Sequence, residues 1–373
     1  MPELTLGDLL AVLLALSLNA YVLLGGADFG GGVWDMLARG PRRVRQREVI
    51  AHAIGPIWEA NHVWLILAVV LAFTCFAPVF ARIMTVLHIP VSLMLVGIVL
   101  RGSAFTFRTY DDEHDAAQRR WGRIFSSASV LTPLLLGVCI GAVASGRVVA
   151  PTTGTFAERF VEPWLTPFAL AVGALTLALF AFLAAVFLTL ETQERELVED
   201  FRRNALGAGV VVFLAAVLVL LLSVGHAPLM TEGLMGSPWA LPLHVATGLS
   251  AIAVFVTLWH RRFALARILA GLQVSCIFWG WTASQYPYLV PPDLTIERSA
   301  APRVTLTITL WALAAGALVL APSLLYLFRV FKSAPDAHAP PPRRGSHVRR
   351  PRSHRPPRPP PTGRGCDRGT PRR

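Results

Sequence analysis

Three ionisable side chains lie in one apolar stretch of the chain, AHAIGPIWEANHVWLILAVVLAF, residues 51–73. Glu59 and His62 are three residues apart, and His52 precedes Glu59 by seven residues. A continuous helix would place all three on one face. A carboxyl group between two imidazoles can pass protons on, because imidazole titrates near neutral pH. The pattern predicts a proton relay; the alternative is a polar face packed against another helix, with Glu59 paired to an arginine.

A second acid, Asp28, lies in the glycine-rich motif GGADFGGG, residues 25–32. Glycines permit tight turns and close backbone approach, so we expect this motif to end the first helix. No strand precedes it, which excludes a dinucleotide-binding turn. Asp28 either takes part in proton uptake or caps the helix and pairs with an arginine of the following loop.

Two arginines bracket the motif RGSAFTFR, residues 101–108. Such side chains can extend to lipid headgroups, or Arg101 can reach an acid on the segment of Glu59. The residues we expect to support the relay as structural or charge partners are Trp58, Asn61, Arg101 and Arg108.

The composition excludes an ordinary soluble enzyme, a disulfide-rich secreted domain and a disordered protein. Hydrophobic residues make up 54% of the 373 residues and charged residues 15%, whereas soluble globular chains have about 25% charged residues. Four cysteines lack the spacing of a zinc site or a disulfide framework. We therefore expect an integral membrane protein.

Nine apolar segments are long enough to cross a bilayer, which needs about 20 helical residues. They are residues 7–26, 50–74, 78–101, 122–145, 165–190, 205–225, 240–260, 263–284 and 305–331. The predicted fold is all-α: a polytopic membrane protein with nine transmembrane helices, arranged as two four-helix sets plus one extra helix. The predicted transmembrane domain covers residues 1–332.

Arginines in the loops predict the orientation of these spans. The loops after the first, third, fifth and seventh spans are rich in arginine, whereas the intervening loops have few cations. Because cationic loops remain in the cytoplasm, we expect the N-terminus outside and the C-terminus inside.

The C-terminal residues 333–373 differ from the rest of the chain. They contain eleven arginines and two aspartates, hence nine of the twelve net positive charges. Such a Pro/Arg-rich segment cannot bury enough apolar surface to fold. We expect a disordered, solvated cytoplasmic tail; a basic arm that binds nucleic acid or anionic lipid is the alternative.

Four motifs together resemble a known family. GADFGGG, IGPIWEANHVWLI, RGSAFTFR and YPYLVPPDLTI are similar, in order and spacing, to motifs in subunit II of cytochrome bd-type quinol oxidases, including the cyanide-insensitive variants. The resemblance covers about residues 7–331 and does not include the tail.

The resemblance implies a complex in the bacterial cytoplasmic (inner) membrane that oxidises quinol and reduces dioxygen to water. In this family the haems and the quinol-oxidising site belong to subunit I. Subunit II supports assembly and, in some members, holds a structural quinone. The expected partners are therefore a haem-bearing subunit I, membrane lipids and, in some complexes, a small accessory subunit, but no nucleic acid. The chain itself is expected to bind no haem or metal and to contain no catalytic residue.

The resemblance also suggests roles for individual residues. Glu59 matches a family acid that carries protons from the cytoplasm toward the haems, and Asp28 matches the acid of the glycine-rich motif. Arg101 and Arg108 match the family's two arginines. The family usually has an acid between the two phenylalanines of that last motif, where this chain has Thr106. If that acid helps to bring protons in, this chain must rely on another group, such as Asp111 or Asp28.

Two other functions remain open at this stage. A secondary transporter also has many spans and buried carboxylates. Alternatively, the chain could ligate haem itself through His52, His62, His88 or His244, since haem iron accepts axial histidines.

Overall fold

The computed structural model describes residues 5–55, 58–110, 115–150 and 154–332. The chain divides into a first unit, Met1–Leu324, and a second unit, Leu325–Arg373. Of the second unit, only the end of the last helix is described. The predicted tail, residues 333–373, lies outside the described residues.

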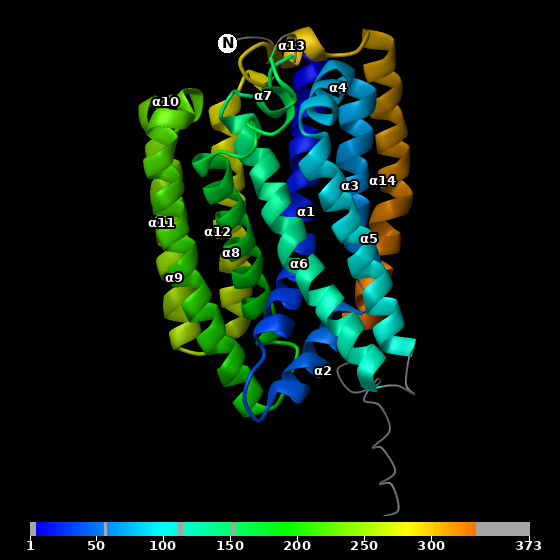
Figure 1. Ribbon diagram of the computed structural model, residues 1–373, viewed down its shortest axis with the longest axis vertical. Coiled ribbons are helices and arrows are strands. Elements are labelled where there is room, and N and C mark those ends of the chain that lie inside the picture. The colour runs from blue at the N-terminus through cyan, green and yellow to red at the C-terminus, as the bar shows by residue number, and fades with distance from the viewer. Residues whose placement is uncertain (1–4, 56–57, 111–114, 151–153, 333–373) are drawn as a thin grey trace, which may run out of the picture. The chain divides into compact units, whose positions relative to one another are not determined.

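Nine long helices make up most of the described chain (Figure 1). They are α1 (Leu6–Leu37), α3 (Trp58–Cys75), α5 (His88–Tyr110), α6 (Asp115–Ala144), α8 (Pro167–Leu188), α9 (Arg195–His226), α11 (Ala240–Trp259), α12 (Phe263–Gln285) and α14 (Arg303–Lys332). Eight are long and apolar enough to cross a bilayer alone, and α3 qualifies when joined to the helix that follows it, from which it is bent by 114°. The described residues therefore agree with the predicted all-α protein of about nine spans.

Short elements connect the long helices at the two ends of the first unit. They are α2 (Arg43–Ile54), α4 (Ala77–Val86), α7 (Phe156–Phe160), α10 (Pro228–Gly236), α13 (Ile296–Ser299) and the antiparallel strands β1 (Tyr288–Val290) and β2 (Leu294–Thr295). Helix α2 lies at one end, and α4, α7, α10 and α13 lie at the other (Figure 1).

The glycine-rich motif does not end the first helix. Helix α1 continues through residues 25–32 to Leu37, and Gly26 and Gly30 face α8. A Cβ atom at Gly30 would lie 1.9 Å from the carbonyl oxygen of Phe180. The expectation of a turn was wrong because these glycines serve helix packing, as small residues do where membrane helices approach closely.

The predicted span at residues 50–74 is interrupted. Helix α2 ends at Ile54 and α3 begins at Trp58, on either side of Pro56 in the sequence, and proline cannot supply the N–H of a continuous helix. The predicted span 78–101 also differs: α4 ends at Val86, and the spanning helix α5 begins at His88.

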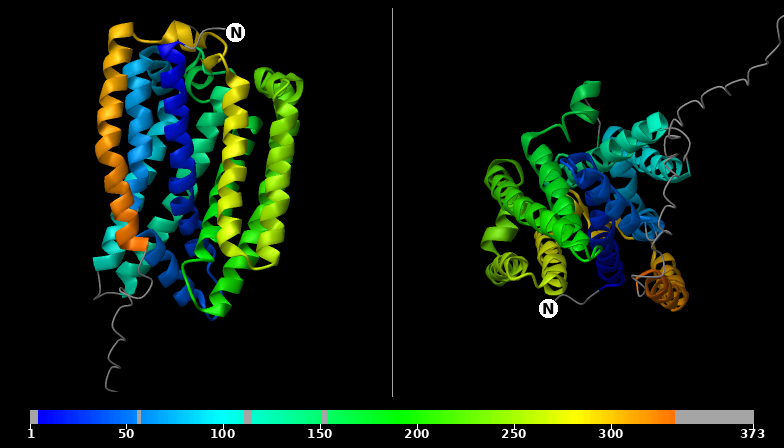
Figure 2. Two further views of the ribbon diagram at one scale, coloured as in Figure 1. Left: turned by 180° about the vertical axis from the view of Figure 1, so that it is seen from behind. Right: turned by 90° about the horizontal axis from the view of Figure 1, so that it is seen from below.

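The two expected four-helix sets lie side by side within the first unit. We call α1, α3, α5 and α6 the first set, and α8, α9, α11 and α12 the second set. Helices α1 and α6 pack along α8, and α1 also lies beside α12 (Figure 2). On α6 and α8, a Cβ atom at Gly137 would lie 2.7 Å from the Cα of Gly173. Glycines thus let the two sets share one closely packed seam.

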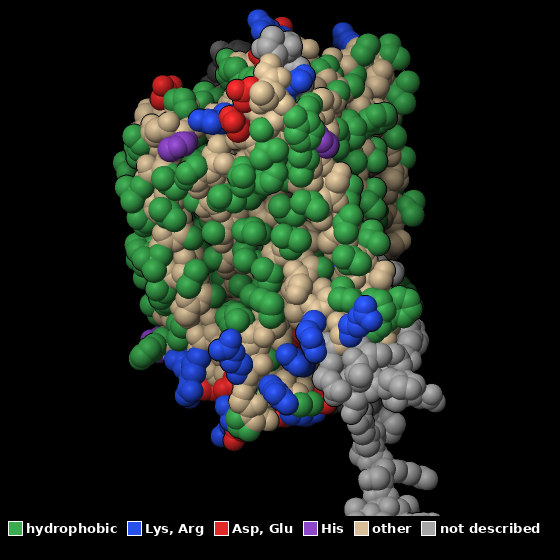
Figure 3. All heavy atoms as spheres, in the orientation of Figure 1, with side chains coloured by type: hydrophobic (Ala, Val, Ile, Leu, Met, Phe, Trp, Pro, Cys, Tyr) green, Lys and Arg blue, Asp and Glu red, His purple; other side chains and the backbone are tan. Residues whose placement is uncertain are grey.

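The outer faces of the long helices are apolar. On the face shown in Figure 3, hydrophobic side chains form a broad band, and arginines gather at the end where α2 lies. Helix α14 is the most exposed, with Trp311 at 73% and Leu318 at 79%. Such faces suit acyl chains or another membrane subunit.

Candidate functional site

Asp28 and Arg101 form a buried ion pair between α1 and α5. Nη2 of Arg101 donates to Oδ1 of Asp28 at 2.6 Å and to the Asp28 backbone oxygen at 3.2 Å, and both side chains are only 2% exposed. Nε of Arg101 donates to Oγ of Ser129 on α6 at 3.1 Å. Burying either charge alone would be strongly unfavourable. The sequence-predicted Asp28 therefore has a partner on another long helix, rather than an arginine of the following loop.

Aromatic rings enclose this pair. The Arg101 Cζ atom lies 4.7 Å from the ring centroid of Phe29 and 5.0 Å from that of Phe125, within the range of cation–π contacts. The His62 ring meets the rings of Phe29 and Tyr21 edge-on, each at 6.0 Å between centroids. Three of the predicted site residues, Asp28, His62 and Arg101, are thus connected through one ring, that of Phe29.

Unsatisfied polar atoms lie in the same set of helices. Oδ2 of Asp28 has no hydrogen-bond partner among the described residues, and neither has Oδ1 or Nδ2 of Asn61, a side chain only 1% exposed. Buried polar atoms of this kind are where proteins hold ordered water or a proton-exchanging group. The side chains of Trp58, Glu59 and Arg108 lie outside the described part of the chain, so their predicted roles stay predictions.

His52 does not share a helical face with Glu59. It lies on α2 and is exposed, whereas Glu59 belongs to α3. The prediction assumed one continuous helix, whereas α2 ends at Ile54 and α3 begins at Trp58. His62, by contrast, lies on α3 and contacts the aromatic rings around Arg101.

The sequence analysis missed a second buried acid, Asp35. It is 2% exposed and lies on α1, two turns after Asp28. Oγ of Ser126 donates to its Oδ2 at 2.7 Å. Its spacing of seven residues from Asp28 was visible in the sequence, but the expectation that the first helix ended at the glycines concealed it.

Thr106 occupies the position where the family motif usually has an acid. Its hydroxyl donates to the carbonyl oxygen of Gly102 at 3.1 Å. It lines a surface hollow of about 660 Å³ between α3 and α5, which His62 and Ser103 also line. Unlike a carboxyl group, the Thr106 hydroxyl does not titrate near neutral pH, so it cannot hold a proton and later release it.

An apolar cavity of about 270 Å³ lies mostly within the second set, and Val22 of α1 and Ile140 and Ala144 of α6 also line it. Phe180, Met230, His244 and Trp281 are among the residues that line it. Nε1 of Trp281 is buried and has no hydrogen-bond partner among the described residues. The cavity thus offers apolar walls and one unused donor, the combination usual for small-molecule sites.

The four histidines considered as haem ligands lie on four different helices: His52 on α2, His62 on α3, His88 on α5 and His244 on α11. Nδ1 of His88 lies 3.0 Å from the carbonyl oxygen of Thr85. Among the described residues, no group of three or more His, Cys, Asp or Glu side chains could hold a metal ion.

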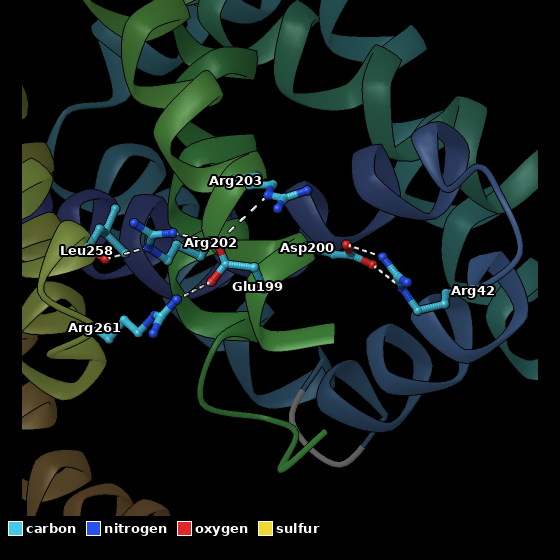
Figure 4. Close-up of polar contacts among 7 residues, drawn as sticks. All are labelled: Arg42, Glu199, Asp200, Arg202, Arg203, Leu258 and Arg261. Atoms are coloured by element: carbon cyan, nitrogen blue, oxygen red, sulfur yellow. Dashed lines mark hydrogen bonds and ion pairs between the residues drawn. The ribbon is translucent and has the colours of Figure 1, made fainter. Parts of the chain in front are cut away.

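Ion pairs at the arginine-rich end join the two sets (Figure 4). Nε and Nη2 of Arg42, just before α2, donate to the two carboxylate oxygens of Asp200 on α9, at 2.8 and 2.7 Å. This hydrogen-bonded carboxylate raises the pKa of Arg42. Beside it, Glu199 pairs with Arg202 at 2.5 Å and with Arg261, in the turn between α11 and α12, at 3.5 Å.

Comparisons with known proteins agree on one family. The sequence model described as "Cytochrome bd terminal oxidase subunit II" matches residues 6–331. The "Putative cytochrome bd menaquinol oxidase subunit II" of Bacillus subtilis is 21% identical over 323 residues, which are 83% of this chain and 91% of the relative. The "Cytochrome bd ubiquinol oxidase subunit 2" of the same organism is 28% identical over 189 residues, 50% of this chain and 54% of the relative.

A solved structure has the same fold. "The structure of bd oxidase from Geobacillus thermodenitrificans" contains a chain that matches with a TM-score of 0.73 at 24% sequence identity. The match covers 88% of this chain and 99% of that chain.

Proposed function

Because the chain belongs to the cytochrome bd terminal oxidase subunit II family, we propose that it is the haem-free subunit of a quinol-oxidising, dioxygen-reducing complex. It stabilises a haem-bearing subunit I in the bacterial cytoplasmic membrane and carries protons toward that subunit. The names of the relatives, a menaquinol and a ubiquinol oxidase, support quinol as the electron donor. The exposed apolar face of α14 offers surface for the partner.

The buried Asp28–Arg101 pair is the observation that carries the proton-transfer proposal. It keeps a carboxylate inside the membrane domain with Oδ2 available to a further donor. The His62 imidazole lies one ring away, across Phe29. A charge in this position is expensive, and ionisable residues kept inside a membrane are therefore functional by default. Glu59, three residues before His62, is the family acid of the same path.

We propose that the arginine-rich end faces the cytoplasm, as cationic loops generally do. Arg42 and Arg261 lie in turns at that end and Arg45 in the first turn of α2. Helix α1 runs from the opposite end, where its first residues lie, to this one (Figure 1). Protons for water formation would then enter at the arginine-rich end.

The second-set cavity fits a structural quinone. Its apolar walls suit a quinone ring or isoprenoid chain, and the unpaired Nε1 of Trp281 could donate to a quinone carbonyl oxygen. When bound, a quinone would supply a two-electron carrier or would fill the cavity as a structural element. Leu179→Asn places a polar side chain in the apolar lining of the cavity, so less quinone should be extracted per purified complex. Unchanged quinone content would show that this cavity is not the quinone site.

Oxygen consumption per mole of haem tests the proton-transfer proposal, because it excludes unassembled protein. Glu59→Gln keeps size and hydrogen bonding but cannot titrate, so turnover per haem should fall by about tenfold or more. Glu59→Asp should retain much more activity. Turnover per haem near wild type in Glu59→Gln, with assembly reduced, would show that Glu59 only holds the structure together.

The haem-free assignment has a separate test. The chain expressed and purified without subunit I should show no Soret absorption band. A stoichiometric haem spectrum from the chain alone would assign haem ligation to its own histidines.

A further inference from the structure

Asp35 is a buried carboxylate that the family motifs do not include. It lies near the end of α1, and 2% of it is exposed. Asp28, Gly32 and Asp35 are spaced by four and three residues, so they lie along one face of α1. Asp28 and Asp35 therefore lie on the same face of α1, about one helical turn before and after Gly32.

The opposing face belongs to α6. A Cβ atom at Gly32 would lie 2.2 Å from Oγ of Ser129, so α1 and α6 approach closely between the two acids. Ser129 accepts from Nε of Arg101, the partner of Asp28, and Ser126 donates to Oδ2 of Asp35 at 2.7 Å. The two serines are three residues apart on α6 and share a face. Together these side chains line one polar seam between α1 and α6 inside an apolar bundle.

The seam opens to solvent at the arginine-rich end. Nε of Arg47, on α2, donates to the backbone oxygen of Asp35 at 3.1 Å and lies 3.9 Å from its Oδ1. Arg47 is 42% exposed, so it joins the buried carboxylate to water. Arg47 from α2 and Ser126 from α6 are the charged and hydroxyl groups whose contacts with this carboxylate are resolved. On the same turn of α1, Trp34 donates to the carbonyl oxygen of Ala181 on α8, which closes the side toward the second set.

We propose that Asp35 is the proton-uptake carboxylate of this subunit and takes over the task of the acid that Thr106 replaces. A hydronium ion from the bulk water beside Arg47 gives a proton to a carboxylate oxygen of Asp35 and becomes water. The proton then passes, through ordered water between Ser126 and Ser129, toward Oδ2 of Asp28, which has no hydrogen-bond partner among the described residues. Each step breaks one O–H bond and forms another, and no electron is transferred. This inference rests on the proposed proton-transfer function and identifies the residue at which protons enter the path.

The test uses the assembled oxidase with subunit I in membranes. Asp35→Asn keeps an oxygen that accepts from Ser126 but removes the titration. Turnover per haem should fall by about tenfold and should lose the wild-type pH dependence, whereas Asp35→Glu should restore both. Asp200→Asn, which alters a carboxylate at the same end but outside the seam, should leave turnover per haem unchanged.

A rescue experiment separates proton uptake from a structural role. Thr106→Asp restores an acid at the family's position, so the double variant Asp35→Asn/Thr106→Asp should regain most of the lost turnover. A purely structural Asp35 would not be rescued from α5, and failure of the rescue would overturn the proposal. If Asp35→Asn does not assemble, Ser126→Ala, which leaves the carboxylate in place, should still slow turnover per haem; wild-type turnover there would also overturn it.

The proposed function can survive when this inference fails. Normal turnover and pH dependence in Asp35→Asn, with slow turnover in Glu59→Gln, would remove Asp35 but keep a proton path in this subunit. Normal turnover in both variants would remove the proton path and this inference with it.

Discussion

The two four-helix sets differ in what their interiors contain. Among the described residues, every fully buried aspartate and arginine, namely Asp28, Asp35 and Arg101, belongs to the first set. The buried polar side chains of the second set are uncharged, and its interior contains an apolar cavity. Because buried charge is costly, the difference fits the proposed proton path in the first set and the proposed quinone site beside the second.

The largest effect should come from removing one charge of the first set. Arg101→Ala leaves the Asp28 carboxylate buried without its cation, which costs about 3–5 kcal/mol. We expect little assembled complex, measured as haem recovered after purification. Arg261→Ala, which removes an exposed ion pair, is the control and should assemble normally. Equal recovery of the two variants would show that the first set does not depend on its buried charge.

A second change targets the close packing of α1 against α8, where the two sets meet. Gly30→Ala places a methyl group against the carbonyl oxygen of Phe180, and such overpacking costs about 1–3 kcal/mol. The thermal midpoint of the purified complex should fall. Gly207→Ala on α9, where no atom lies within 4 Å of the added methyl group, should leave the midpoint unchanged or raise it slightly. If both variants behave alike, close contact between the sets is not required.

A third, smaller change opens the ionic link between the sets at the arginine-rich end. Arg42→Ala removes a two-point contact with Asp200 whose side chains are 41% and 15% exposed. We expect a small loss of stability, read as a lower thermal midpoint, and a smaller difference at high salt because exposed charges are screened. Arg203→Ala, which alters an exposed pair with Glu199 on the same helix, should have less effect. A loss that does not change with salt would mean that packing dominates.

The smallest effect concerns α7, in the connection between α6 and α8. The backbone N–H of Thr155 donates to the Glu158 carboxylate in a capping box and holds the pKa of Glu158 below its usual value of 4.5. A carboxyl group with a depressed pKa stabilises the fold above its unfolded-state pKa, and this contribution disappears as the pH falls through the folded-state pKa. The thermal midpoints of wild type and Glu158→Ala should therefore differ slightly at pH 7 and converge as the pH falls below the folded-state pKa of Glu158. Divergence on acidification would contradict this cause.

Much of the architecture could be predicted from the sequence because it depends on local composition. A run of about 20 apolar residues must form a helix in a bilayer, where backbone groups have no water to bind. Loop arginines and the four motifs required no knowledge of contacts. The errors concern residue types that have more than one structural role. Glycine can turn the chain or let helices pack closely, and the glycines of residues 25–32 were expected to turn the chain. Pro56 was expected to lie inside a span.

The sequence by itself determined that this protein crosses a membrane about nine times, that it belongs with the bd-type oxidase subunits, and that Asp28, His62 and Arg101 merit attention. Only the tertiary structure decided that Arg101 pairs with Asp28, that His52 stands apart, and that Asp35 continues the line of Asp28. These are contacts between helices distant in the chain, and α1 meets α5 and α6 only after the bundle has packed. The local sequence pattern predicts which face of a helix is polar. Which helix packs against that face depends on tertiary packing, for example on how closely Gly32 lets α6 approach α1.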